Sequence, residues 1–87
     1  MVDIFLKQED GETLAQYFGY RLGVIRKARK MSQKELSDKA GISLASVTAY
    51  ENGNTEPVLR NVCSLADALG VSPDVLCGRE PKEANIR

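Results

Sequence analysis

The sequence contains no histidine and no tryptophan, and only two cysteines among its 87 residues. Cys63 and Cys77 form no CxxC or Cys/His pattern, so we expect no metal site and no other cofactor. We expect both cysteines to be buried, as small apolar side chains usually are. Because histidine is missing and the carboxylates are scattered, no pairing of a nucleophile with a base is visible, and the sequence predicts no enzyme.

Long apolar runs are also missing. No stretch approaches the roughly 20 apolar residues that a membrane helix needs, and the apolar segment at residues 2–6 is too short for a signal peptide. We therefore expect a cytoplasmic protein. With 43% hydrophobic and 28% charged residues, the composition is typical of a soluble globular domain with one small core.

The formal net charge is zero, but the charges are unevenly distributed. Residues 20–39 carry a net charge of +5, whereas residues 1–19 carry −3 and residues 40–87 carry −2. A basic face on an acidic body is expected of a protein that attracts a polyanion, and a solvated amphipathic helix is the alternative. The basic residues in question are Arg21, Arg26, Lys27, Arg29, Lys30, Lys34 and Lys39.

The stretch 33–52 carries the clearest local signals. Ser32 followed by Glu35 is the pattern of a capping box, which predicts a helix over 33–39. Gly41 suits the left-handed residue that ends such a helix, and Ser43 is placed to cap a second helix over 44–52. The residues expected to face the core are Leu36, Ala40, Ile42, Val47 and Tyr50. Two short helices joined by so tight a turn predict a helix-turn-helix.

These residues resemble the helix-turn-helix of the lambda-repressor-like (Cro-type) DNA-binding family. The match includes Gln33, Leu36, Ser37, Ala40, Gly41, Ile42, Val47, Tyr50 and the Glu51-Asn52-Gly53 ending. The wider resemblance covers residues 20–78. It implies an all-α, five-helix domain that binds double-stranded DNA and regulates transcription. A repressor or controller acting on a two-fold-related operator is the expected type.

Three further helices are predicted, over 14–30, 57–69 and 73–76. Thr13 with Gln16 forms a second capping box, and Pro57 opens the fourth helix. Gly19 and Gly23 either break the first helix, so that it begins at Tyr20, or allow another helix to approach closely. The expected inward residues are Leu14, Phe18, Leu22 and Ile25, then Leu59, Val62, Ala66 and Leu69, with Val58 and Leu65 flanking.

We divide the chain into a helix-turn-helix domain at 13–78, an N-terminal arm or short extension at 1–12, and a flexible tail at 79–87. The resemblance implies that a homodimer forms. Its surface would come from the fifth helix, with Val71, Val75 and Leu76, or from the arm with Phe5.

The resemblance also assigns site residues, with the helix 43–52 lying in the major groove. The base-facing residues would be Ser43, Leu44, Ala45, Thr48 and Ala49. The phosphate-contacting residues would be Gln33, Lys34, Asn52, Asn54 and Thr55. Gln33 stands at a helix N-terminus, whose dipole and free N–H groups attract phosphate. Arg26 and Glu51 occupy the positions of a structural ion pair.

The predicted base-facing side chains are uncharged and mostly apolar. Leu44, Ala45 and Ala49 can meet thymine methyl groups but cannot form the bidentate bonds that Arg or Gln forms with purines. Together with the zero net charge, this gives a rival hypothesis more weight than usual, although DNA binding remains the main expectation. In that hypothesis the same fold serves as a protein-interaction module, such as an antitoxin-like adaptor.

Overall fold

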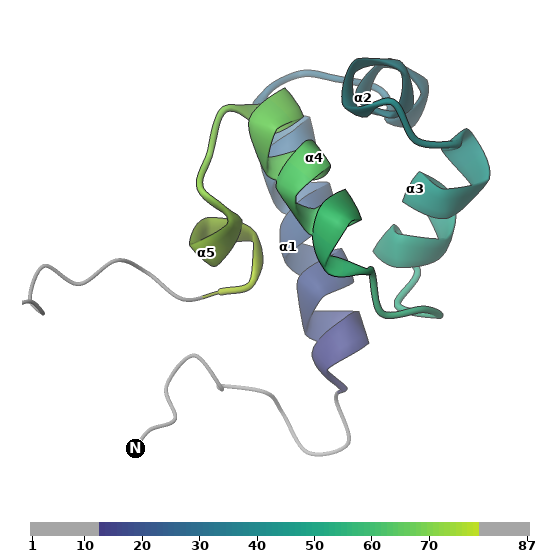
Figure 1. Cartoon of the computed structure of the whole chain (residues 1–87), viewed down its shortest axis with the longest axis vertical. Coiled ribbons are helices and arrows are strands. Elements are labelled where there is room, and N and C mark those ends of the chain that lie inside the picture. The colour runs from purple at the N-terminus through teal and green to yellow at the C-terminus, as the bar shows by residue number, and fades with distance from the viewer. Residues whose placement is uncertain (1–12, 79–87) are drawn as a thin grey trace, which may run out of the picture.

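The computed structural model describes residues 13–78, which form five helices and no strand, as predicted. In chain order they are α1 (Leu14–Ala28), α2 (Gln33–Ala40), α3 (Leu44–Glu51), α4 (Leu59–Leu69) and α5 (Pro73–Leu76). Figure 1 shows α1 and α4 in the middle, with α2 and α3 on one side and α5 on the other. None of these helices is long and apolar enough to cross a membrane. The predicted arm 1–12 and tail 79–87 lie outside the described residues.

The helix starts follow the capping residues read from the sequence. The hydroxyl oxygens of Thr13, Ser32 and Ser43 each accept the backbone N–H three residues further on, at 3.0, 2.9 and 3.0 Å. Both predicted capping boxes are complete. Gly41 ends α2 in the left-handed conformation, at φ 74°, and the chain turns directly into α3. Local hydrogen bonds therefore set the bounds of the helix-turn-helix.

Gly19 allows α3 to pack directly against α1. A Cβ atom at this position would overlap the carbonyl oxygen of Tyr50 and lie 3.0 Å from that of Glu51. Helix α1 is continuous through Gly19, so a start at Tyr20 was wrong, and the close approach of a second helix is what the glycine provides. The backbone cost of a glycine in α1 is offset by this contact.

The core lies among all five helices. The rings of Phe18 and Tyr50 meet edge to face, with centroids 6.3 Å apart. The Tyr50 hydroxyl accepts a hydrogen bond of 2.7 Å from the Asn61 side chain, which ties α3 to α4. The fully buried side chains are Leu22, Leu36, Val47, Leu65 and Leu76. Burying each of them contributes about 1.5–3 kcal/mol to the free energy of folding.

The inward faces of α1 and α4 differ from the prediction at their first turns. Leu14 and Leu59 were expected inside but are 55% and 76% exposed, whereas Leu65, expected at the flank, is fully buried. Helix α4 also begins two residues later than predicted, because the extended Val58 accepts its first hydrogen bond and Pro57 precedes this cap. Leu14 and Leu59 are the first residues of α1 and α4, and their exposure shows that no neighbouring element within residues 13–78 covers them there.

The expectation of two buried cysteines was wrong for Cys63, which is exposed on α4. The buried stripe of this helix runs through residues 62, 65, 66 and 69, and position 63 falls on the solvent side of that stripe. Cys77 is partly buried and packs against the core. Composition alone does not place a cysteine on one side of a helix.

Helix α1 ends at Ala28, two residues before the predicted end. The Met31 N–H donates to the Arg26 carbonyl at 3.2 Å, and the Lys30 N–H donates to the Lys27 carbonyl at 2.9 Å. This pair of bonds is a Schellman motif, and it places Lys30 in the left-handed region at φ 60°. A side chain with a Cβ is disfavoured there, so the turn between α1 and α2 carries local strain.

Replacing Lys30 with glycine should therefore stabilise the protein. We expect Lys30→Gly to raise the free energy of unfolding by about 0.5–1 kcal/mol, after allowing for the greater freedom of glycine in the unfolded chain. Urea denaturation of both variants measures this. Lys30→Ala is the matched control, because it removes the same charge but keeps the Cβ, and it should bring no gain. Equal stabilities of the two variants would contradict the assignment of strain.

Candidate nucleic-acid interface

One side of α3 is turned away from the core. Val47 and Tyr50 point inward, so residues at the complementary helical positions lie on the outer side. The outer residues, all predicted to face bases, are Leu44, Ala45, Thr48 and Ala49. Leu44 is 42% exposed and Ala45 is exposed, whereas Thr48 and Ala49 are half-buried. The structure thus gathers these four on one uncharged and mainly apolar face, which we call the outer face of α3.

Ser43, also predicted to face bases, is committed to capping α3. Its hydroxyl accepts the Ser46 N–H at 3.0 Å and donates to the Ser46 hydroxyl at 2.9 Å. Although Ser43 is exposed, its one hydroxyl proton already has an acceptor. The capping role fixes where the outer face of α3 begins.

The predicted phosphate residues lie at the start of α2 and in the loop after α3. Asn52, Asn54 and Thr55 are exposed. Their loop is held to α3 by hydrogen bonds from Asn54 N–H to the Ala49 carbonyl (3.1 Å) and from Gly53 N–H to the Tyr50 carbonyl (3.0 Å). The loop backbone is therefore positioned by the same helix that carries the outer face.

Lys34 is exposed on α2 and forms an ion pair of 2.9 Å with Asp38 one turn later. Both side chains are about two-thirds exposed, at 68% and 64%. Such a pair contributes little to stability, so Lys34 can exchange this partner for another anion at small cost.

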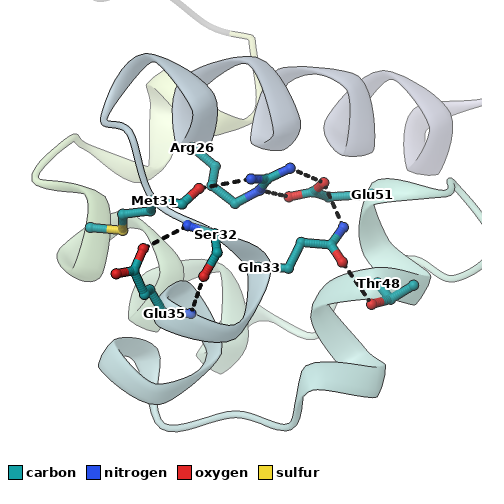
Figure 2. Close-up of polar contacts among 7 residues, drawn as sticks. All are labelled: Arg26, Met31, Ser32, Gln33, Glu35, Thr48 and Glu51. Carbon is teal, nitrogen blue, oxygen red and sulfur yellow. Dashed lines mark hydrogen bonds and ion pairs between the residues drawn. The ribbon is translucent and has the colours of Figure 1, made fainter.

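The structure brings together Arg26 and Glu51, the residues expected to form a structural ion pair. Arg26 donates from Nε to Glu51 Oε2 at 2.7 Å and from Nη2 to Oε1 at 3.0 Å, and its Nη1 donates to the Met31 carbonyl at 2.8 Å (Figure 2). The two side chains are only 11% and 9% exposed. The hydrogen bond to Glu51 raises the pKa of Arg26, and burial opposes that rise only in part.

Gln33 and Thr48 extend this pair into a chain of hydrogen bonds that the sequence did not reveal. Gln33 Nε2 donates to Glu51 Oε1 at 2.9 Å, and the Thr48 hydroxyl donates to Gln33 Oε1 at 3.1 Å (Figure 2). Gln33 is half-buried between α2 and α3. The one feature of the sequence that indicates a shared partner is the spacing of Thr48 and Glu51, which are three residues apart and therefore on the same side of α3.

The basic stretch at residues 20–39 is less available than its net charge suggested. The charge of Arg26 is balanced by that of Glu51 in the buried pair. Arg21 and Arg29 donate, each at 2.8 Å, to the backbone carbonyls of Val75 and Leu69 at the ends of α5 and α4. The remaining lysines, Lys27, Lys30 and Lys39, are exposed. Part of the predicted basic face therefore serves to join helices.

Removing one partner of the Arg26–Glu51 pair should destabilise the protein strongly. We expect Arg26→Met and Glu51→Leu each to cost about 3–5 kcal/mol, because each strands a buried charge. A domain of this size has about 5–10 kcal/mol in total. The double variant should recover much of the loss, because apolar packing can replace a buried pair. Chemical denaturation of the three variants measures the coupling.

The exposed pair of Lys34 and Asp38 supplies the matched control. Lys34→Met and Asp38→Leu should each change stability by about 0.5 kcal/mol or less, because this pair remains solvated. Losses at Arg26 and Glu51 that are simply additive would show that the buried pair contributes no coupling.

Comparisons with known proteins place this geometry in a family. The family model described as helix-turn-helix matches residues 22–76. The transcriptional repressor RstR of the cryptic phage CTXphi from Vibrio cholerae is 43% identical over 65 residues, which are 75% of this chain and 58% of that protein. The chain thus spans little more than half the length of this curated relative.

Two solved structures share the fold. The restriction-modification controller protein C.AhdI from Aeromonas hydrophila superposes with a TM-score of 0.70 at 34% identity, over 71% of this chain and 94% of that one. The c2 repressor of phage P22, solved in complex with a synthetic operator, superposes with a TM-score of 0.64 at 36% identity, over 68% and 89%. The chain belongs to the helix-turn-helix family, in the lambda-repressor-like group that its sequence predicted.

Proposed function

We propose that this protein binds double-stranded DNA through α3 and regulates transcription in the cytoplasm as a repressor or controller. The observation that carries the proposal is the outer face of α3, which lies opposite the core, is partly exposed, and is flanked by the start of α2. A helix presented in this way fits the major groove. That a 36% identical repressor was solved in complex with a synthetic operator supports DNA as the ligand.

The phosphate contacts that we propose come from Gln33, Lys34 and the exposed residues of the loop after α3. The first N–H groups of a helix have no intrahelical acceptor. In α2 the Ser32 hydroxyl satisfies the N–H of Glu35, which leaves those of Gln33 and Lys34 for a phosphate oxygen. The loop would add Asn52, Asn54 and Thr55. Such contacts fix the position of α3 in the groove without reading sequence.

We also propose that two copies bind a two-fold-related operator, with α3 of each copy entering successive major grooves. The residues named for the α5 interface offer little apolar surface, because Leu76 is fully buried and Val71 packs against the core. The large apolar side chains that are exposed in residues 13–78 lie on α1, α3 and at the start of α4. The alternative surface, the arm with Phe5, lies outside the described residues.

Binding to DNA of mixed sequence should depend steeply on salt. Each neutralised phosphate contributes about −0.9 to the slope of log K against log salt. Fluorescence anisotropy with a labelled duplex, from low to physiological salt, gives the slope. Lys34→Gln should make it shallower, whereas Asp67→Asn, at an exposed position of α4, should not. A flat dependence, or no binding, would favour the protein-interaction adaptor over a DNA-binding regulator.

The outer face of α3 should prefer thymine. Leu44→Ala should relax base preference at one position of the half-site and leave the salt slope unchanged, because Leu44 contacts a methyl group and no phosphate. Selection from a random-site library, followed by exchange of thymine for deoxyuridine, tests this. Leu59→Ala removes a second exposed leucine, on α4, and should change no base preference. Half-sites rich in guanine would refute the prediction.

A further inference from the structure

A series of hydrogen bonds links Arg26, Glu51, Gln33 and Thr48 in that order. In this series, only one assignment of donors and acceptors is possible. Arg26 has only donors, and two of its N–H groups hold Glu51, whose carboxylate oxygens only accept. The Gln33 group that lies 2.9 Å from Glu51 Oε1 must therefore be its amide NH2. This leaves the Gln33 amide oxygen facing Thr48, and an amide oxygen only accepts.

It follows that the Thr48 hydroxyl must donate its single proton to Gln33. Only the lone pairs of Thr48 Oγ1 then remain for any further partner. Thr48 is half-buried on the outer face of α3, beside the exposed Leu44. A free threonine hydroxyl can rotate to donate or to accept, whereas this hydroxyl is restricted to accepting. The restriction originates in the buried Arg26–Glu51 pair, because Gln33 links Glu51 to Thr48.

The four bases differ in what they offer to such an acceptor, so the preference applies to the base on the strand that Thr48 faces. In the major groove adenine and cytosine present amino groups, at N6 and N4, whereas guanine O6 and N7 and thymine O4 are acceptors. An acceptor facing a second acceptor forms no bond and leaves both groups desolvated. The Thr48 lone pairs therefore favour the two amino-bearing bases.

We propose that Thr48 is a specificity-determining residue that selects an adenine or cytosine amino group over a guanine or thymine oxygen. In this proposal Gln33 is a positioning residue, because it fixes the polarity of the Thr48 hydroxyl. The inference rests on the proposed function, since it requires α3 to lie in the major groove. It goes further by stating which hydrogen-bonding group of the base is recognised and why.

A library selection with the full chain tests the proposal. The wild type should enrich adenine or cytosine at one half-site position. Thr48→Val, which keeps the shape and removes the hydroxyl, should lose that preference, and Thr48→Ser should keep it. Gln33→Met should admit guanine or thymine at the same position, because the hydroxyl is then free to donate. Ser64→Ala, which removes a hydroxyl from α4 and none from α3, should change no base preference.

A second measurement needs no variant of Gln33. In a synthetic operator, the base that Thr48 reads is replaced by an analogue without its amino group, purine for adenine or 2-pyrimidinone for cytosine. The wild type should lose about three- to tenfold in affinity, as expected for one hydrogen bond, and Thr48→Val should lose nothing further. These binding titrations use only the wild type and Thr48→Val, so they test the proposal even if Gln33→Met does not fold.

The outcomes separate the two proposals. If no duplex is bound at any salt concentration, DNA binding itself fails, and the role of Thr48 fails with it. If DNA is bound but the Thr48-dependent position selects guanine or thymine, or no position depends on Thr48, only the present inference is overturned. The same holds if the analogue binds as well as the natural base.

Discussion

The buried ion pair of Arg26 and Glu51 is the constraint on which the rest of the arrangement depends. Two charges that are about nine-tenths buried must meet with good geometry, because their desolvation offsets most of their attraction. The observed placement of the end of α3 against α1 achieves this, with two hydrogen bonds of 2.7 and 3.0 Å. Gly19 leaves room for that approach, and the Met31 carbonyl takes a further Arg26 proton. The pair therefore specifies the direction of α3 more than it adds to stability.

Local signals predicted much of this fold, because the helix ends are governed by residues near one another in the chain. The capping boxes at Thr13 and Ser32 and the left-handed Gly41 required no tertiary information. Apart from two helix bounds, at the end of α1 and the start of α4, the errors concern burial. Periodicity identifies the side of a helix that faces inward, but not whether a neighbour covers its first turn, and Leu59 is exposed for that reason. Cys63 shows a similar limit, because cysteine is usually buried but the residue type alone does not determine which side of α4 it occupies.

The candidate site was predictable in outline but not in its hydrogen bonding. The outer face of α3 follows once Val47 and Tyr50 are placed inside, since the helical period fixes the opposite side. The partners of Gln33 do not follow, because a polar side chain at a helix start has no periodic pattern and can face solvent or a neighbouring helix. Its contact with Thr48 depends on how α2 crosses α3, which is a tertiary property.

The electrostatics of this protein also suggest how affinity and specificity are divided. Three of the seven arginines and lysines in residues 20–39 are held against Glu51 or against backbone carbonyls of α4 and α5. In the DNA complex that we propose, attraction to phosphate relies on a few exposed lysines and on the N-terminus of α2, which is consistent with zero net charge. In the complex that we propose, discrimination between bases comes from the apolar outer face and from Thr48, because phosphate contacts position α3 without reading sequence. A fixed α3 is what such a face requires, because methyl contacts and a single directed hydrogen bond are sensitive to small displacements of the helix.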